Sequence, residues 1–208
     1  MRSQPNYNRT AHIVVSDFRV HPTAEVHPDA VIGAGSSIWH QAQVREGATL
    51  GPGCIIGKGA YIGEHVVLGA NCKVQNYSCV YPGTTLEDGV FVGPEVVFTN
   101  DRYPRAINPD GTLKSESDWE LGKTLVKFGA AVGSRSVIVT GVTIGRWALI
   151  AAGSVVTKDV PDHALVVGAP ARQAGWVCMC AHPLDEALMC GHCGRRYAPG
   201  ESGLAERP

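Results

Sequence analysis

The stretch from Val20 to Phe98 carries an apolar residue at every sixth position. No polar residue interrupts the series Val20, Val26, Ile32, Ile38, Val44, Leu50, Ile56, Ile62, Leu68, Val74, Val80, Leu86, Val92 and Phe98. The fourth residue after each of these is usually small, as at Ala24, Ala42 and Cys54, and turn formers fill the gaps. One bulky and one small residue per hexad is what short strands joined by tight corners require. The fixed period therefore predicts a solenoid in which each turn buries its apolar edge on the next.

Other fold classes do not fit this pattern. A β-sandwich shows turn signals about every 8 to 12 residues. A helix needs apolar residues at i, i+3 and i+4 with few glycines, whereas this chain has 25. We therefore expect an all-β protein whose main domain is a parallel β-helix of hexapeptide repeats.

The repeat breaks once. Residues 99–125 are rich in polar residues, Pro and Gly and hold no hexad position, and a loop of this length inside a compact fold is usually functional. The period then resumes at Val126, Val132, Ile138, Ile144, Ile150 and Val156.

The limits of the repeat and the change in composition after it divide the chain into four parts. We predict a lead-in segment over residues 1–19, with a possible edge strand from His12 to Val15. The β-helix domain then covers residues 20–175, including the inserted loop 99–125, and is followed by a Cys-rich, zinc-ribbon-like module over residues 176–197. The tail, residues 198–208, is predicted to be disordered.

Composition and charge exclude some partners. A formal net charge of −1 gives no overall attraction to nucleic acid or to an anionic membrane. No apolar run is long enough to cross a bilayer, and the first residues lack the apolar core of a signal peptide. We expect no nucleic-acid partner, no membrane insertion and a cytoplasmic location. In that reducing compartment Cys54 and Cys72, one coil apart, are expected as small core residues rather than a disulfide.

Several strings resemble a known family. The hexads, the inserted loop and the strings VTGVTIG, GSVVTKDVP and GAPAR resemble the hexapeptide-repeat acyltransferases. That resemblance implies a left-handed β-helix, a homotrimer with active sites between subunits, and acetyl-CoA as co-substrate.

A narrower resemblance concerns the substrate. SIWH at 37–40, KVQN at 73–76, TTLEDGVFVGP at 84–94, KTLVK at 123–127 and the terminal CxC…CxxCG are similar to N-acetyltransferases that modify UDP-2-acetamido-3-amino-2,3-dideoxy-glucuronate. This implies a nucleotide-sugar substrate acetylated at its 3-amino group, and a role in surface (lipo)polysaccharide biosynthesis. A dTDP-3-amino-deoxyhexose stays open as the alternative substrate, because the sequence does not fix the C5 group or the nucleotide.

Acetyl transfer to an amine needs a held thioester and donors for the oxyanion that develops on its carbonyl. His40, Lys58 and Asn76 occupy one hexad position in three consecutive coils, so they should form a ladder with a step of about 4.8 Å. Asn76 is the first catalytic candidate, orienting the amine or the acetyl carbonyl. It could instead be a turn residue with a left-handed backbone. His40 is a second catalytic candidate, although a surface histidine is ordinary, and Lys58 is expected to bind substrate.

The start of the inserted loop gives a second grouping. Asn100 and Asp101 are expected to recognise the sugar, with Asp101 as a possible proton acceptor and third catalytic candidate. Arg102, Tyr103 and Arg105 follow at once, and this composition suits a carboxylate or diphosphate. The alternative that both arginines are merely solvated stays open.

The family resemblance also places coenzyme A. It implies that pantetheine lies near Ala130, Ser136 and Ala148 in a groove contacted mainly by backbone groups. Lys158 and Arg172 are then the cations for the coenzyme phosphates. Lys158 could instead cap the end of the coil.

Four cysteines crowd the C-terminus, namely Cys178, Cys180, Cys190 and Cys193. Two thiols spaced by two residues in a Gly-containing turn form a good half of a zinc site, while the spacing of one in Cys178-Met-Cys180 is poorer. His182 or His192 could replace a thiol, and unliganded thiols are the alternative. We predict a closed, structural four-thiolate zinc site with no catalytic role.

Two other functions are less compatible with the sequence. A γ-type carbonic anhydrase needs three histidines around an open zinc, and no close pair among His21, His27, His40 and His65 is spaced for such a site. A non-catalytic scaffold, with the Cys-rich module as docking surface, would not explain the long polar loop.

Overall fold

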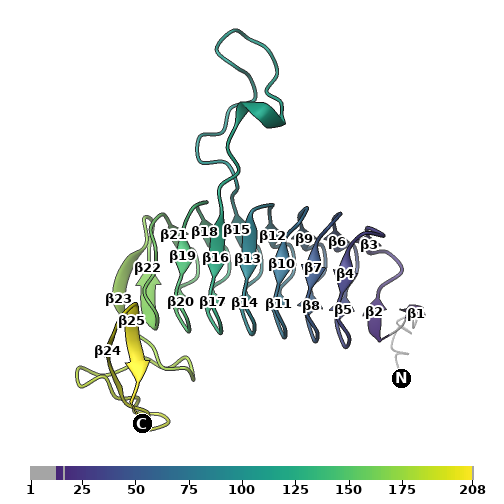
Figure 1. Ribbon diagram of the computed structural model, residues 1–208. Helices are drawn as coiled ribbons and strands as arrows, with labels where there is room; N and C mark the ends of the chain where they lie inside the picture. Colours follow the sequence, from purple (N-terminus) through teal and green to yellow (C-terminus); the bar gives the residue numbers. More distant parts are fainter. Residues whose placement is uncertain (1–12, 16, 208) are drawn as a thin grey trace, which may run out of the picture.

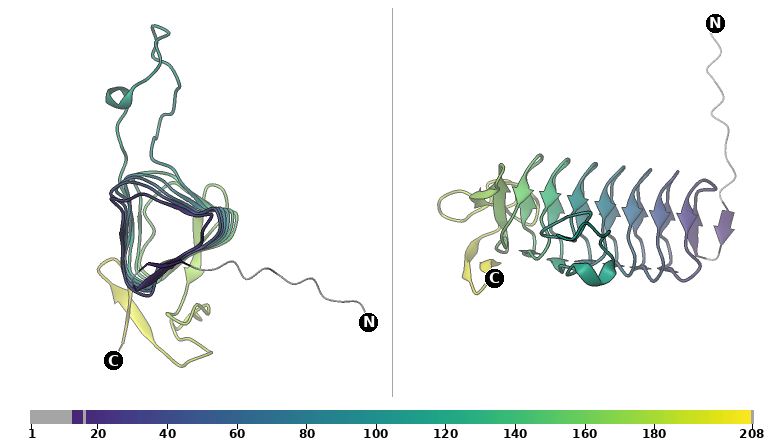
Figure 2. Two further views of the ribbon diagram at one scale, coloured as in Figure 1. Left: turned by 90° about the vertical axis from the view of Figure 1, so that its right-hand side faces the viewer. Right: turned by 90° about the horizontal axis from the view of Figure 1, so that it is seen from above.

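A computed structural model describes residues 13–15 and 17–207 and shows a parallel β-solenoid. Successive coils stack along a straight rod that is triangular in cross-section (Figures 1 and 2). Each complete coil gives one short strand to each of three parallel sheets, which we call sheets A, B and C. The all-β solenoid is confirmed, and its left-handed winding stays a prediction. His12 and the start of the chain, for which no signal peptide was expected, lie outside the described residues.

The strands follow the hexads and fall into the three sheets. Sheet A contains β1 (Ile13–Val15), β2 (Phe18–Val20), β5 (Ser37–Ile38), β8 (Ile55–Ile56), β11 (Lys73–Val74), β14 (Phe91–Val92), β17 (Ala131–Val132), β20 (Leu149–Ile150), β22 (Ala164–Val167) and β23 (Arg172–Trp176). Sheet B contains β3 (Glu25–Val26), β6 (Gln43–Val44), β9 (Tyr61–Ile62), β12 (Cys79–Val80), β15 (Val97–Phe98), β18 (Val137–Ile138) and β21 (Val155–Val156). Sheet C contains β4 (Val31–Ile32), β7 (Thr49–Leu50), β10 (Val67–Leu68), β13 (Thr84–Leu86), β16 (Thr124–Val126) and β19 (Thr143–Ile144).

The core is the interior of the triangle. The hexad residue is the second residue of most strands and points inward, so that Ile56, Ile62 and Leu68 are fully buried. Cys54 and Cys72 are free thiols buried at the corners, as predicted, and the thiol of Cys54 donates to the carbonyl of Gly69 at 3.1 Å. The interior is therefore continuous and mostly apolar, with a few buried serines such as Ser78 and Ser136.

Close stacking of coils requires glycine at some corners. At Gly59, where φ is +62°, an added Cβ would lie 2.6 Å from Cδ1 of Tyr77 in the next coil. A side chain at Gly59 would push the Tyr77 ring away, so the sequence of one coil restricts that of the next.

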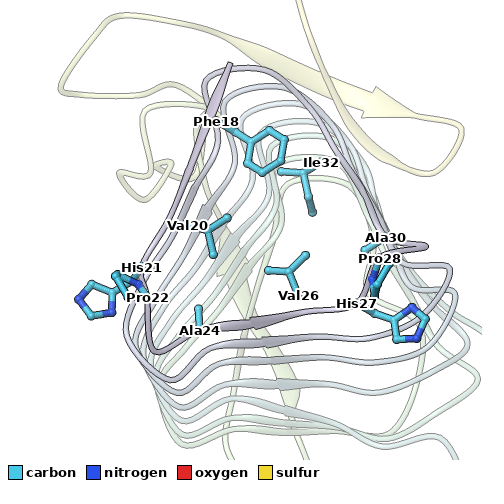
Figure 3. A pocket seen from close by; sticks show the side chains of 10 residues that line it. All are labelled: Phe18, Val20, His21, Pro22, Ala24, Val26, His27, Pro28, Ala30 and Ile32. Carbon is cyan, nitrogen blue, oxygen red and sulfur yellow. The ribbon is translucent and has the colours of Figure 1, made fainter. Parts of the chain in front are cut away.

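The N-terminal end of the rod presents a hollow of about 350 Å³. Val20, Val26 and Ile32 point into it, whereas His21 and His27 point outward at two corners (Figure 3). β1 pairs antiparallel with β2, so the expected edge strand is present over Ile13–Val15.

The inserted loop leaves the rod between β15 and β16 and projects from one corner (Figures 1 and 2). It contains the 3-10 helix η1 (Glu116–Asp118). The predicted end of the loop at Leu125 is wrong, because Thr124 and Leu125 pair with β13 as part of β16. No helix in the described part of the chain is long and apolar enough to cross a bilayer.

The predicted disordered tail is wrong. Residues 197–206 form an antiparallel hairpin of β24 (Tyr197–Gly200) and β25 (Gly203–Glu206). Leu204 is only 6% exposed and packs in a small second core with Tyr197, Cys178 and Cys190. The tail was predicted to be disordered because its composition is mostly polar, and the burial of Leu204 was not foreseen. Pro208 lies outside the described residues.

Candidate functional site

The predicted polar ladder lies at the corner between sheets A and B. His40, Lys58 and Asn76 occupy equivalent places in three consecutive coils, because the amides of Gly59 and Tyr77 donate to the carbonyls of His40 and Lys58, both at 2.9 Å. The three side chains help to line a surface hollow of about 250 Å³. The hexad register thus brings an imidazole, an ammonium and an amide to one edge of the rod.

The side chain of Asn76 already has one structural partner. Its Oδ1 accepts a hydrogen bond of 2.9 Å from the backbone amide of Lys58. The left-handed residue at this corner is Tyr77, with φ of 60°, so the alternative of a left-handed Asn76 is wrong. Because Oδ1 faces a donor, the side-chain NH2 group is what Asn76 can offer to a ligand. It therefore suits an acetyl carbonyl better than an amine.

Sequence reasoning missed a neighbour of His40. The rings of His21 and His40 stack with centroids 3.5 Å apart, and the Nδ1 atom of His21 lies 3.2 Å from the donating amide of Thr23. This stacked pair was not expected from the sequence. A spacing of nineteen residues, one more than a coil, was the signal that could have found the pair. No third histidine of the described residues stacks on this pair.

The loop forms a second hollow, of about 380 Å³, against the coil that follows it. Its lining is Asp101, Arg102, Tyr103, Lys114, Asp118, Trp119, Glu120, Gly122, Thr140 and Gly141. Lys114 and Trp119 were not predicted, although a lone Trp in a polar loop was a visible signal. Two cations beside carboxylates can bind a polar, charged ligand here.

The individual loop residues differ in how they are held. Asp101 accepts a hydrogen bond of 2.7 Å from the amide of Tyr103, and Arg102 Nη1 lies 3.5 Å from the carbonyl of Thr140. The backbone carbonyl of Asn100 accepts a hydrogen bond from the amide of Gly122. The guanidinium of Arg105 donates a hydrogen bond to the carbonyl of the adjacent Pro104. Neither Asn100 nor Arg105 lines the hollow.

The ladder and the loop belong to different corners of one chain. Asn76 follows a sheet A strand and precedes a sheet B strand, whereas Asp101 follows β15 of sheet B. The structure therefore does not bring the catalytic candidates Asn76 and His40 to Asp101 within a single chain.

The residues assigned to coenzyme A divide into two groups. Ala130, Ser136 and Ala148 are at most 1% exposed and point into the corners of the core, so their side chains do not reach a ligand. Lys158 and Arg172, in contrast, line one surface hollow of about 280 Å³ at the C-terminal end of the rod. Two cations in one hollow suit the phosphates of an anionic coenzyme.

The four C-terminal cysteines converge. All four Sγ atoms lie within 4.8 Å of one another, with 3.4 Å between Cys178 and Cys193 and 3.6 Å between Cys180 and Cys190. A zinc ion at about 2.3 Å from four thiolates would hold them about 3.8 Å apart, so the donor set and spacing fit zinc. The poor spacing of Cys178-Met-Cys180 is thus no obstacle.

Arg195 favours the thiolate form of one of the four cysteines, Cys193. Hydrogen bonds from the backbone and the guanidinium of Arg195 lower the pKa of Cys193 to about 6. His182 stacks on His192 with centroids 4.0 Å apart, outside the set of four sulfurs.

Comparisons with known proteins identify the type of repeat in this chain. A family profile described as "Hexapeptide repeat of succinyl-transferase" matches residues 28–63, 60–97 and 129–158. A dTDP-3-amino-3,6-dideoxy-alpha-D-galactopyranose 3-N-acetyltransferase of Aneurinibacillus thermoaerophilus is 51% identical over 80 residues, which cover 37% of this chain and 41% of that protein. The bifunctional protein GlmU of Nitratidesulfovibrio vulgaris is 34% identical over 119 residues, covering 48% of this chain and 26% of GlmU.

Among solved structures, a hexapeptide-repeat acetyltransferase of Vibrio cholerae, solved with acetyl coenzyme A, is 25% identical. The superposition has a TM-score of 0.54 and covers 62% of this chain and 70% of that one. The part of this chain that matches the Aneurinibacillus enzyme spans less than half the length of that enzyme, and the same holds for the match to GlmU.

Proposed function

We propose that this chain is a hexapeptide-repeat acetyltransferase and that it transfers an acetyl group from acetyl-CoA to the amino group of a nucleotide-linked amino sugar. The observation that carries the proposal is the register that sets His40, Lys58 and Asn76 along one edge beside a hollow. The name of the Aneurinibacillus relative describes this reaction on a dTDP-linked sugar.

The proposed chemistry needs few groups. The sugar nitrogen attacks the thioester carbonyl carbon, a C–N bond forms, the C–S bond breaks, and the proton lost by nitrogen ends on the sulfur of CoA. The NH2 group of Asn76 donates to the carbonyl oxygen as negative charge develops on it, which is worth most in the transition state. His40, positioned by its stack on His21, takes up the proton of the amine.

The loop hollow is proposed to hold the sugar nucleotide. Arg102 and Lys114 provide positive charge for a diphosphate or a sugar carboxylate, and Asp101 provides a carboxylate oxygen for a hydroxyl or the amine. The narrower resemblance favours UDP-2-acetamido-3-amino-2,3-dideoxy-glucuronate. The 51% identity to the Aneurinibacillus enzyme favours a dTDP-3-amino-3,6-dideoxyhexose.

A direct assay separates these substrates. The full chain is mixed with acetyl-CoA and one of the two 3-amino sugar nucleotides, with a 4-amino sugar nucleotide as control, and release of free thiol is followed. We expect release with one of the 3-amino sugars and much less with the control. No release above background with any sugar would contradict the proposal.

We also propose that the active site lies between the subunits of a homotrimer. The ladder and the loop lie at different corners of one chain, so packing rods side by side is what would bring Asn76 of one subunit to the loop of the next. Mixing an Asn76→Ala chain with an Arg102→Ala chain then regenerates intact sites. We expect such co-refolded mixtures to recover roughly a quarter of wild-type activity, as random pairing of subunits predicts. No recovery, with both chains trimeric by light scattering, would contradict the shared site.

Coenzyme A is proposed to place its phosphates in the hollow that Lys158 and Arg172 line. The hollow is on the surface, and both cations can form charge-assisted hydrogen bonds with phosphate oxygens. The pantetheine arm is then contacted by backbone groups, because the side chains of Ala130, Ser136 and Ala148 are buried.

The Cys cluster is proposed to hold a structural zinc ion. Four thiolates leave no open coordination position, so the metal takes no part in acetyl transfer. Mass-spectrometric metal analysis should find about one zinc per chain, and Cys190→Ser should lose it. A full chain that carries four free thiols and no metal when purified with zinc present would contradict this site.

A further inference from the structure

The last coil of the solenoid is completed by a segment from outside the repeat. Sheet C ends at β19, and Ile144 of that strand still pairs with Val160. Beyond this point Asp162 has no further coil on which to stack. Its amide instead donates to the carbonyl of Ser202 at 2.8 Å, and its carbonyl accepts from Leu204 at 3.2 Å. The β24–β25 hairpin thus closes an edge that would otherwise expose unpaired backbone groups.

The fit between hairpin and coil is close. Asp162 and Gly203 form an isolated parallel bridge, and Gly203 has φ of +144°. A Cβ on Gly203 would lie 2.4 Å from the carbonyl oxygen of Asp162. Only glycine allows this approach, so the docking is specific to this place on the hairpin.

Tyr197 links the hairpin to the cysteine cluster. Its hydroxyl lies 3.1 Å from Sγ of Cys178 and accepts a hydrogen bond of 3.1 Å from the amide of Met179. Its ring contacts His163 with centroids 4.8 Å apart. The Nδ1 atom of His163 is hydrogen-bonded to the carbonyl of Val177, and the backbone amide of Val177 donates a hydrogen bond to the carbonyl of His163. One buried side chain therefore touches a proposed metal ligand and the last corner of the coil.

The apolar core of this module is too small to order it alone. Its buried members are Cys178, Cys190, Tyr197 and Leu204, and two of these are proposed ligands. The other residues that pack against this cluster are only partly buried, namely Trp176, Cys180, Leu184 and Leu188. Fixing each residue costs about 1–2 kcal/mol of conformational entropy, and modules with so little core are usually stabilised by a metal or a disulfide. The cysteines here form no disulfide, and a metal ion held by their four sulfur atoms would supply the cross-link.

We propose that metal bound by the four cysteines acts as a clamp that holds the β24–β25 hairpin on Asp162 and so caps the C-terminal end of the solenoid. This inference rests on the proposed zinc site and not on the acetyltransferase activity. The bound zinc would hold the side chain of Cys178 in place, and Cys178 in turn contacts the hydroxyl of Tyr197. The ring of Tyr197 packs on His163, so Tyr197 holds the hairpin against this corner of the coil. Loss of the metal frees the hairpin and opens the edge, while the inner coils keep their pairing.

Hydrogen exchange of backbone amides in the full chain tests the clamp. After removal of the metal with a chelator and reductant, checked by metal analysis, the amides of Asp162 and Leu204 should exchange at least about 100-fold faster. The amide of Lys73, which donates to Val90 inside sheet A, is the internal control and should be unchanged.

A pair of glycine variants separates docking from metal binding. Gly203→Ala clashes with Asp162 but leaves every cysteine in place, so it should keep its zinc and show fast exchange at Asp162. Gly175→Ala is the matched control, because its Cβ would meet nothing within 4 Å and it lies outside the cysteine cluster. It should behave as wild type.

Three results would overturn the clamp. One is a metal-free chain in which Asp162 and Leu204 stay protected. Another is a zinc-loaded Gly203→Ala chain with wild-type exchange at Asp162. The third is a metal-free chain in which Lys73 exchanges as fast as Asp162, because the metal would then stabilise the whole rod and not the hairpin alone. In each case the thiol-release assay reports on the acetyltransferase independently.

Discussion

Asn76 has two functional groups that a mutation can separate. Its Oδ1 accepts from the amide of Lys58 at 2.9 Å, and its NH2 group is free to meet a ligand in the hollow. Asn76→Asp keeps an acceptor for Lys58 and removes the donors. We expect it to leave stability nearly unchanged and to lower kcat by about 10²–10³-fold, the usual effect of removing one oxyanion donor.

Asn76→Ala removes both groups. The lost hydrogen bond should lower the free energy of unfolding by about 1 kcal/mol, which is a fall in Tm of roughly 2–4 °C for a chain of this size. Asp88→Ala is the matched control, since Oδ1 of Asp88 accepts from the amide of Ala70 at 2.7 Å at a different corner. It should lose a comparable amount of stability and keep its turnover.

Thermal unfolding by circular dichroism and thiol release measure the two effects separately. Equal turnover in Asn76→Asp and wild type would refute the catalytic role and leave Asn76 as a link between coils. A large loss of turnover in Asp88→Ala would show that the assay reports on stability instead.

Three further perturbations test other parts of the structure. Lys158→Ala and Arg172→Ala should each weaken CoA binding about 10-fold by calorimetry, the value of one charge-assisted hydrogen bond; unchanged affinity would contradict the phosphate assignment. Phe98→Ala empties a fully buried site where the loop begins and should lower the free energy of unfolding by about 3–5 kcal/mol in urea titrations; a loss below 1 kcal/mol would contradict its packing. Burial lowers the pKa of His163 below 6.5, despite the nearby carboxylates of Asp162 and Glu206. The unfolded chain therefore takes up the proton first as pH falls, and wild type should lose stability below about pH 6.5 more steeply than His163→Asn; parallel pH profiles would contradict this.

The sequence determined the interior and the register of the rod. Those depend on local spacing, because one apolar and one small residue per hexad can be buried only if the chain turns every six residues. The inward direction of Ile56 and Leu68, the burial of Cys54 and the alignment of His40 with Asn76 were therefore predictable.

Tertiary structure decided what each exposed polar group meets. The contact of His21 with His40 and the use of Asn76 Oδ1 by Lys58 depend on how two coils stack, which a period alone does not specify. The separation of the ladder from the loop depends on which corner each occupies. The ordered tail depends on a partner far from it in sequence, since Gly203 and Leu204 pair with Asp162. Burial follows local pattern, whereas polar contacts follow from which surfaces the folded chain brings together.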